Sequence, residues 1–398
     1  MQLSTFSLCV AAFAISGSFA AEPPKPYGDY CLVNDGNMYD PSKANNTRWF
    51  TIDLDKDPED RWREVASLYK VEIGELLDVI KNMSFPFFHG KLIQWVDTYF
   101  PTWVDKIPEP YSSELKGIAN ATGIELGQIV LYNVFYEVFS VCTSVVAQDT
   151  NGKMYHARNM DFGLFMGWNA TTHDWKITER LRNILFNVNW VKNGKTIYKS
   201  VNFAGYIGVY NGVKQGKFTV TMNERFDLYG GYLGLIGWLL GLTPDVKFST
   251  YLVREAMEQA ETFMEAVEMM RNDRIIAPAY YIIGGPNPGE GMVITRSLSK
   301  VADEVWMANS TYGYPKWYTL QTNYDPDGPP MFLDDRRTPG HKCMQLLGQD
   351  RVGFKGLFNM LSSKTNLNKL TAYTVLMQVD DGSLETYLQK CNDPCWAF

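Results

Sequence analysis

The stretch that decides the fold is Val138–Gly163, which reads VFSVCTSVVAQDTNGKMYHARNMDFG. Apolar and polar residues alternate on both sides of Asn151-Gly152, and this is the strongest short-range signal for a β-hairpin. Cys142 heads one expected strand, and Arg158 and Asp161 end its partner. Directly opposed residues of paired strands lie about 5 Å apart. The sequence therefore predicts that a thiol, a guanidinium and a carboxylate converge at one end of this hairpin.

The segment before the hairpin is mostly helical, and the segment after it is rich in strands. Helical spacing of apolar residues begins near Arg61, and Thr122-x-x-Glu125 is a capping-box pattern that opens a helix leading to Cys142. A helical interlude of one or two pieces covers Thr250–Arg271, with Thr262 capping the second piece. Strands are expected at 49–54, 142–148, 153–159, 183–191, 196–202, 204–210, 217–223, 275–283, 291–296, 304–308, 316–322, 372–379 and 383–389, and a further helix near 354–361. This order predicts an α+β fold with stacked sheets covered by helices.

Length and charge narrow the class of protein. A chain of 398 residues exceeds the usual single core of about 250–300 residues, so two domains or two chains packed together are expected. The net charge of −7 argues against a nucleic-acid-binding protein, which needs a basic face. The apolar stretch 226–242 is shorter than the roughly 20 residues that span a bilayer and is interrupted by glycines. It is expected to line a groove, to dip into a membrane surface or to form a buried helix. The aromatic segment 91–103 is interpreted as part of the core or as a face that binds a lipid or a partner.

Residues 1–20 have the features of a secretory signal peptide. Leu8–Ile15 is an apolar core, and Ser18 and Ala20 fit the small-residue pattern before a cleavage site. A buried N-terminal helix is the alternative. Five Asn-x-Ser/Thr acceptor sites agree with secretory passage and are glycosylation candidates: Asn45, Asn82, Asn120, Asn169 and Asn309.

Removal of the leader takes away Cys9 and leaves an odd number of cysteines: Cys31, Cys142, Cys343, Cys391 and Cys395. Thiols in an oxidising compartment usually pair, so one of these stays free or bonds elsewhere. Cys391 and Cys395 are close enough in sequence to close a small loop, although four cysteines allow three connectivities. Cys142 is the natural one to remain free, which is what a nucleophile requires.

A thiol becomes a useful nucleophile when a base lies within reach or a cation lowers its pKa. His156 is the nearest of four histidines, and strand alternation places it on the same face as Arg158. Nothing around Cys142 resembles the papain-type motif that uses a histidine partner. A cut between Val141 and Cys142 would create an α-amino group, whose pKa is ordinarily about 8, on the residue that carries the thiol. That amine can serve as the base, whereas the plain alternative is a buried free cysteine.

Four motifs, in this order, resemble the acid ceramidase family. They are CTSVVAQDTNGKMYHARNMDFG at Cys142–Gly163, NERF at Asn223–Phe226, QTNYD at Gln321–Asp325 and LDDRRTP at Leu333–Pro339. This family consists of lysosomal N-terminal-nucleophile (Ntn) hydrolases of the cholylglycine hydrolase group, and the resemblance covers nearly the whole chain after the leader. It implies the αββα sandwich of Ntn hydrolases.

The resemblance also implies a division of the chain. Residues 21–141 would form a mostly helical alpha subunit, and residues 142–398 the Ntn-hydrolase beta subunit. The implied disulfides are Cys31–Cys343, which would hold the two chains together after cleavage, and Cys391–Cys395.

The same resemblance implies the residues of the active site. Arg158 would favour the thiolate, and Asp161 would accept a hydrogen bond from the α-amine; their alternative is a structural ion pair. Asn323 matches an oxyanion-stabilising residue, and each such donor in a dry site is worth about 3 kcal/mol. Arg336 matches an active-site arginine, and Glu224 matches a residue near the site. A turn-forming role is the alternative for Asn323.

Three functions remain open. The first is a lysosomal, or additionally secreted, amidohydrolase that cleaves ceramide to sphingosine and fatty acid after self-cleavage between Val141 and Cys142. The second keeps the mechanism but acts on N-acylethanolamines. The third is a non-enzymatic secreted lipid carrier, which leaves the odd cysteine unexplained. No HExxH, CxxC or EF-hand pattern occurs, so neither a metal nor another cofactor is expected. Because ceramide resides in membranes, a membrane surface or a saposin-like activator is the expected partner.

Overall fold

The computed structural model describes residues 31, 39–88, 103–136, 140–162, 167–226, 234–235, 237–238, 241–243, 246–309, 311–330, 334–393 and 395–396. The expected signal peptide, nearly all of the aromatic segment 91–103 and most of the glycine-rich stretch 226–242 lie outside these residues.

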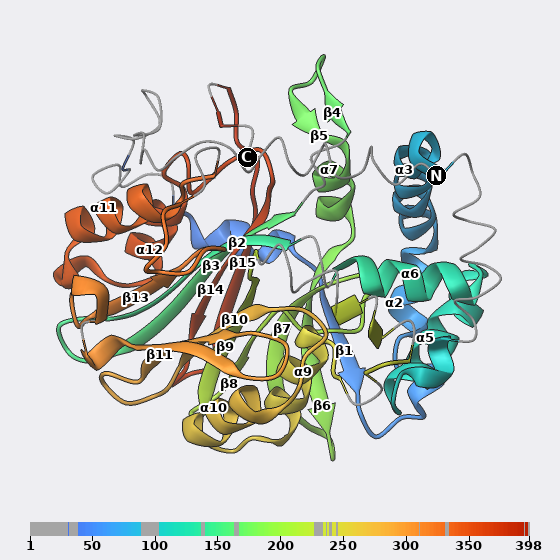
Figure 1. The fold of residues 1–398 in the computed structure, drawn as a ribbon, viewed down its shortest axis with the longest axis horizontal. Helices are drawn as coiled ribbons and strands as arrows, with labels where there is room; N and C mark the ends of the chain where they lie inside the picture. Colours follow the sequence, from blue (N-terminus) through green and yellow to red (C-terminus); the bar gives the residue numbers. More distant parts are fainter. Residues whose placement is uncertain are drawn as a thin grey trace.

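Two β-sheets are stacked at the centre of the molecule (Figure 1). The first has eight strands in the order β1 (Trp49–Asp53), β6 (Leu185–Lys192), β7 (Lys195–Phe203), β8 (Asn211–Lys214), β9 (Phe218–Glu224), β10 (Ala279–Gly284), β11 (Gly291–Arg296) and β12 (Val301–Trp306). The second has five strands in the order β13 (Tyr318–Gln321), β2 (Ser140–Gln148), β3 (Met154–Phe162), β14 (Thr371–Gln378) and β15 (Ser383–Leu388). The inward faces of β2 and β9 meet between the sheets.

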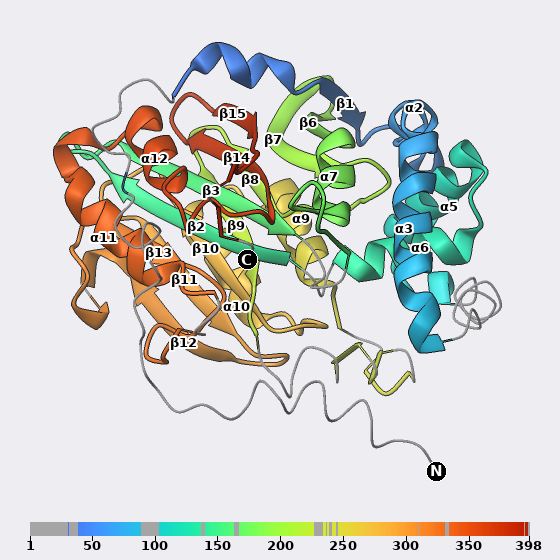
Figure 2. The ribbon, with the colours of Figure 1, turned by 90° about the horizontal axis from the view of Figure 1, so that it is seen from above.

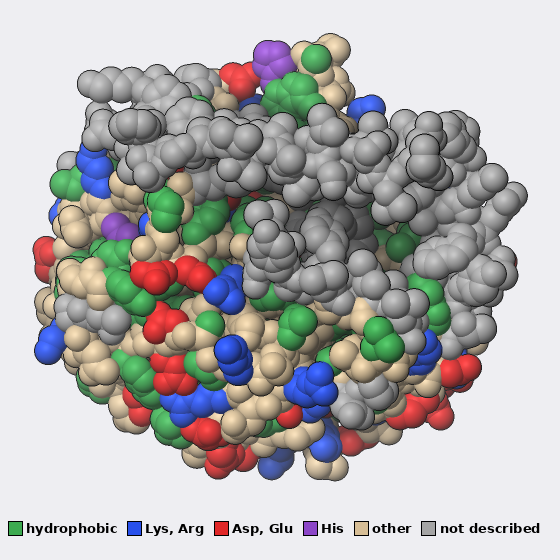
Figure 3. All heavy atoms as spheres, in the orientation of Figure 1, with side chains coloured by type: hydrophobic (Ala, Val, Ile, Leu, Met, Phe, Trp, Pro, Cys, Tyr) green, Lys and Arg blue, Asp and Glu red, His purple; other side chains and the backbone are tan. Residues whose placement is uncertain are grey.

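Helices cover the outer face of each sheet. Helices α9 (Ser249–Gln259) and α10 (Phe263–Asn272) pack on the eight-stranded sheet, and α11 (Arg337–Leu347) and α12 (Phe354–Leu361) pack on the five-stranded sheet (Figures 1 and 2). The predicted α+β class and the αββα sandwich are therefore confirmed. Figure 3 shows acidic and basic side chains interspersed over the lower part of one face, so the net negative charge is not gathered there.

The predicted hairpin is present as β2 and β3. Its turn contains Gly152 with φ +84°, a left-handed conformation that glycine adopts without steric cost. The register pairs Cys142 with Met160 and Val141 with Asp161. Because successive side chains in a strand point to opposite faces, Cys142 and Arg158 share the face between the sheets, and Asp161 belongs to the other face.

The segment before Cys142 forms a helical group beside the sandwich and one strand within it. The group contains α2 (Arg63–Leu68), α3 (Lys70–Phe88), α5 (Tyr111–Thr122) and α6 (Leu126–Tyr136), at the right of Figure 1. Strand β1 adds to the eight-stranded sheet as a parallel edge strand next to β6, with Trp49 opposite Asn187. A fully buried ion pair joins Glu114 of α5 to Arg254 of α9, with Nη1–Oε2 at 2.5 Å. The N-terminal segment is thus part of the same core.

Two expectations about local structure are wrong. The segment 204–210 is not a strand, because the chain turns at residues 204–205, and the strand that follows is β8. Thr122 does not open a helix: it ends α5, where its hydroxyl donates to the carbonyl of Ile118 and accepts from the backbone N–H of Ile124. Helices α7 (Lys176–Asn183) and α11 had no sequence prediction.

The cap predicted at Thr262 is present, since its hydroxyl accepts from the N–H of Glu265 at 3.1 Å. Within the part of the chain that is described, no helix has both the length and the apolar character needed to cross a bilayer.

Candidate active site

Cys142 lies near the start of β2, in the core between the two sheets, and its side chain is fully buried. It is a free cysteine, whereas the structure joins Cys31 to Cys343 and Cys391 to Cys395 by disulfides. Val141 and Cys142 are consecutive residues of the strand, so the bond expected to be cut lies within β2.

Arg158 contacts the sulfur of Cys142. Its Nη2 donates to Sγ at 2.6 Å, and its Nη1 donates to the carbonyl of Tyr210 at 2.7 Å. The guanidinium also lies 5.5 Å from the centroid of the Tyr210 ring, an arrangement that favours a cation. Burial raises the pKa of the Cys142 thiol, and the charge and hydrogen bond of Arg158 oppose that rise. Arg158 is therefore the group in contact with the sulfur that favours the thiolate.

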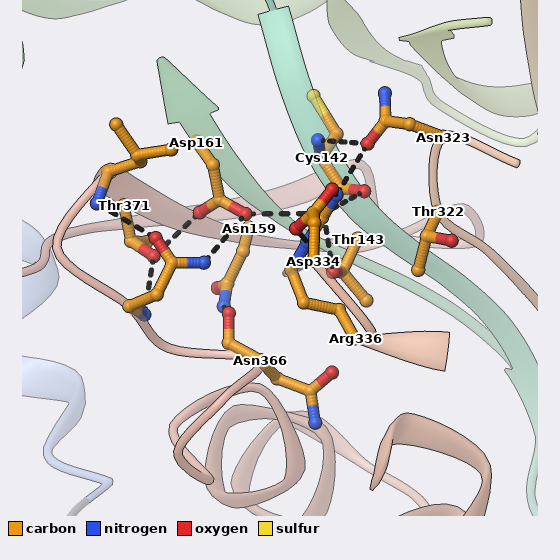
Figure 4. Close-up of polar contacts among 12 residues, drawn as sticks. Cys142, Thr143, Asn159, Asp161, Thr322, Asn323, Asp334, Arg336, Asn366 and Thr371 are labelled. Carbon is orange, nitrogen blue, oxygen red and sulfur yellow. Dashed lines mark hydrogen bonds and ion pairs between the residues drawn. The ribbon is translucent and has the colours of Figure 1, made fainter. Parts of the chain in front are cut away.

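Arg336 holds the backbone of Cys142 (Figure 4). Its Nη1 donates to the carbonyl oxygen of Cys142 at 2.6 Å and to Oγ1 of Thr143 at 3.2 Å. Asp334 binds the same guanidinium through two oxygens, with Nε–Oδ1 at 2.6 Å and Nη2–Oδ2 at 2.8 Å. A two-pronged carboxylate contact of this kind fixes both the position and the plane of an arginine.

Asn323 connects Arg336 to the amide of Cys142. Its Oδ1 accepts from the backbone N–H of Cys142 at 2.9 Å and from Nη2 of Arg336 at 2.8 Å. Its Nδ2 donates to the backbone carbonyl of Glu224 at 2.6 Å. Asn323 thus touches the nitrogen of the bond that is expected to be cut, and Glu224 meets this network through its main chain.

Asp161 lies in a polar pocket on the other face of β3. Its carboxylate accepts from Oγ1 of Thr371 at 2.6 Å and from Nδ2 of Asn368 at 3.4 Å, and Nη1 of Arg336 lies 3.4 Å away. Burial raises the pKa of Asp161 to about 6, against the opposing pull of Arg336. In this arrangement the N–H of Cys142 donates to Asn323 and not to Asp161. Asp161 is connected to Cys142 through Arg336, whose Nη1 contacts both residues.

His156 is not placed to serve as the base. Its Nδ1 lies 2.9 Å from Oγ1 of Thr219 and its Nε2 lies 3.0 Å from Oγ1 of Thr221, so both ring nitrogens are engaged. Burial lowers the pKa of His156 to about 3. The sequence could not exclude this residue, but the structure does.

Three contributors were not identified from the sequence: Asp334, Tyr210 and Thr371. Asp334 lies within the LDDRRTP motif, and a carboxylate two residues before an arginine is the signal that could have indicated the pair. Tyr210 acts through its backbone carbonyl, which carries no sequence signal. Arg337, which follows Arg336 in the LDDRRTP motif, donates to the carbonyls of Asp325 and Gly328.

The remaining predictions concern surface sites and metals. Asn120 and Asn309 are exposed and Asn169 is half-buried, whereas the side chains of Asn45 and Asn82 lie outside the described residues. Among the described residues, no group of three or more His, Cys, Asp or Glu side chains could hold a metal ion.

Comparisons with known proteins place the chain among amide hydrolases. Residues 142–325 match the family model of linear amide C–N hydrolases, choloylglycine hydrolase family, and residues 45–107 match the beta subunit of N-acylethanolamine-hydrolyzing acid amidase. The chain is 41% identical to acid ceramidase of Homo sapiens over 393 residues, covering 98% of each chain. It is 38% identical to acid ceramidase of Mus musculus over 387 residues, covering 97% of each.

A solved structure shares the fold. The Caenorhabditis elegans N-acylethanolamine-hydrolyzing acid amidase ortholog superimposes with a TM-score of 0.52 at 27% identity, covering 63% of this chain and 100% of that one. The lipid-carrier hypothesis has no support in these matches, which are to hydrolases. The buried thiol with its two arginines and the extent of the sequence match lead to one conclusion: the chain belongs to the acid ceramidase family.

Proposed function

We propose that this protein hydrolyses the amide bond of ceramide to give sphingosine and a free fatty acid, with Cys142 as the nucleophile. The observation that carries the proposal is the contact between Arg158 Nη2 and the Cys142 sulfur at 2.6 Å, in a chain that is 41% identical to human acid ceramidase. A thiol beside a guanidinium, with its backbone held on both sides, is equipped for nucleophilic attack on an amide.

The nucleophile is proposed to be made by self-cleavage. Sγ of Cys142 attacks the carbonyl carbon of Val141, the C–N bond breaks, and the departing nitrogen takes up the proton that the thiol loses. Water then hydrolyses the thioester, which leaves a carboxylate on Val141 and a free α-amine on Cys142. The contacts of Asn323 with the Cys142 nitrogen and of Arg336 with the Cys142 carbonyl hold this residue during the rearrangement.

Turnover is proposed to use the same thiol. The sulfur attacks the ceramide carbonyl carbon, and the new α-amine transfers the thiol proton to the nitrogen of departing sphingosine. Water then releases the fatty acid from the acyl-enzyme. Asn323 is the proposed oxyanion donor; its Nδ2 would leave the Glu224 carbonyl for this role. Arg336 maintains the position of Asn323 throughout.

Mass spectrometry of the purified protein tests self-cleavage. The wild-type precursor should yield a chain that begins at Cys142, and Cys142→Ala should stay uncut and inactive on ceramide. Equal thermal unfolding temperatures of uncut wild type and Cys142→Ala would show that the variant is folded. A Cys142→Ala chain that is cut at the same bond would contradict the proposal.

N-acylethanolamine hydrolysis is the second candidate. It is favoured by the structural match to the N-acylethanolamine-hydrolyzing acid amidase ortholog and by the match of residues 45–107. Values of kcat/KM for ceramide and for an N-acylethanolamine of the same acyl length decide between them. We expect ceramide to be the better substrate, and a clear preference for the ethanolamide would reverse the assignment.

Subunits, location and partners are part of the same proposal. The two chains formed by cleavage, 21–141 and 142–398, would stay linked by the Cys31–Cys343 disulfide. The signal-peptide features of residues 1–20 and the five Asn-x-Ser/Thr acceptor sites support secretory passage, to the lysosome or additionally out of the cell. Because its substrate lies in a bilayer, we expect the enzyme to work at a membrane surface or with a saposin-like activator.

A further inference from the structure

Two buried nitrogen donors near Cys142 have no hydrogen-bond partner among the described residues. They are Nδ2 of Asn211 and Nε of Arg158, and both side chains are fully buried. A buried donor without an acceptor costs about 1–3 kcal/mol, and such groups in a native protein need an explanation. A bound ligand that supplies an acceptor oxygen would give these two donors a partner.

The two donors belong to one cluster around the sulfur. Nη1 of Arg158 binds the carbonyl of Tyr210, the residue directly before Asn211. Oδ1 of Asn211 accepts from the hydroxyl of Tyr373 at 2.7 Å. Tyr373 stands opposite Met160 in the sheet, and Met160 stands opposite Cys142. The Asn211 amide therefore reaches from the eight-stranded sheet toward the row of side chains that contains the thiol.

In the structure, the Asn211 amide faces Tyr373 with its oxygen. A phenol hydroxyl that donates to Oδ1 leaves Nδ2 as the free end of the amide. Nδ2 can only donate, so its ligand must supply an acceptor. Nε of Arg158 is a second buried donor without a partner among the described residues. This side of the thiol therefore suits a ligand oxygen that accepts hydrogen bonds.

We propose that Asn211 is a specificity-determining residue that binds a hydroxyl of the amino alcohol from which the acyl group is cleaved. This inference rests on the proposed amidase function. Asn323, the proposed partner of the amide oxygen, contacts the backbone N–H of Cys142, whereas Asn211 belongs to the cluster around its sulfur. The oxygen that remains for Asn211 is a hydroxyl two carbons from the amide nitrogen. N-acylethanolamines carry one such hydroxyl and ceramide carries two; the one that both classes share is the primary hydroxyl, on C1 of ceramide.

The test compares substrates that differ only in this hydroxyl. One pair is ceramide and 1-deoxyceramide, and the other is an N-acylethanolamine and the N-acylethylamine with the same acyl chain. For the wild-type enzyme we expect kcat/KM to be about tenfold to a hundredfold higher for the hydroxylated member, because its absence leaves Nδ2 unpaired. In Asn211→Leu this preference should fall to less than about threefold. A loss of the preference in both pairs supports the assignment of Asn211 to the primary hydroxyl that the two classes share.

Asn187 provides a matched control. It is also a buried asparagine of the eight-stranded sheet whose Oδ1 accepts from a hydroxyl of the five-stranded sheet, that of Thr386 at 2.7 Å. Asn187→Leu should lower the unfolding temperature but keep the substrate preference. Tyr373→Phe, which frees the amide to turn, should reduce the preference in part.

The outcomes separate the two proposals. A wild-type enzyme that hydrolyses both members of each pair equally well, or an Asn211→Leu variant that keeps the full preference, overturns the role of Asn211 and leaves the amidase function standing. A folded, self-cleaved wild-type enzyme that hydrolyses none of the four amides overturns both.

Discussion

Two buried arginines approach Cys142 from opposite faces of strand β2, and their surroundings differ. Arg336 is bound by both oxygens of Asp334, so its charge is matched by a carboxylate. Arg158 instead contacts a thiol, a backbone carbonyl and a tyrosine ring. A matched arginine fixes geometry, whereas an arginine without a carboxylate favours an anion on its neighbour. We therefore propose that Arg336 positions Cys142 and that Arg158 activates its thiol.

The largest expected effect comes from removing the partner of Arg336. Asp334→Asn leaves a buried cation that has lost its two-pronged carboxylate, and we expect the free energy of unfolding to fall by about 3–5 kcal/mol. Urea unfolding in the uncut Cys142→Ala background measures this change without interference from cleavage.

The neighbouring acid provides the control for that prediction. Asp335 accepts from the N–H of Thr338 at the start of α11, and Asn keeps an acceptor oxygen there, so Asp335→Asn should cost less than about 1 kcal/mol. Equal losses in the two variants would show that Asp334 and Arg336 do not form a special pair.

A second prediction uses the carboxyl group behind Arg336. Burial raises the pKa of Asp161 from its ordinary value of 3.8 to about 6, so folding favours the protonated form of this group. The stabilisation that it provides is complete below pH 3.8 and is lost as the pH rises through 6. The loss amounts to about 3 kcal/mol. Unfolding free energies of Cys142→Ala, measured from mildly acidic to neutral pH, should show this decline.

In the Cys142→Ala/Asp161→Asn double variant, the decline should be smaller by about that amount, since an amide does not titrate in this range. The same slope in both proteins would mean that Asp161 is ionised at acidic pH in the folded state.

The third prediction concerns Arg158 and the thiol. Arg158→Met removes the charge next to Sγ, which should raise the pKa of the thiol and slow self-cleavage about a hundredfold, or about 2.7 kcal/mol. Mass spectrometry of the purified precursor over time gives the rate.

Arg158→Lys keeps the charge and should restore part of that rate. Identical self-cleavage rates for Arg158→Met and Arg158→Lys would show that the charge at position 158 does not activate the thiol and that the side chain contributes only packing.

The sequence was informative where a local pattern determines the structure. Alternation around Asn151-Gly152 predicted the hairpin, and with it the approach of Arg158 to Cys142. The expected convergence of the Asp161 carboxylate with the thiol was wrong in one respect. Asp161 is three residues after Arg158, so strand alternation places its side chain on the opposite face of the sheet from Cys142. The stacked sheets followed from the order of elements, but the αββα arrangement came only from the family resemblance.

Other features depend on contacts between distant segments. The 204–210 segment has the apolar content of a strand, yet its residues turn back to cover the core, and tertiary packing outweighs local preference there. The carbonyl of Tyr210 and the free Nδ2 of Asn211 become visible only when β8 and β3 face each other. No pattern within either strand indicates them.

The position of strand β1 indicates whether folding or the proposed cleavage comes first. It closes one edge of the large sheet beside β6, and it comes from the N-terminal side of the proposed cut. A C-terminal piece made alone would expose the backbone of β6 as an unpaired edge strand. Such edges pair with other chains and cause aggregation. We therefore expect the N-terminal piece to act as an intramolecular chaperone, so that the proposed cut follows the folding of the whole polypeptide.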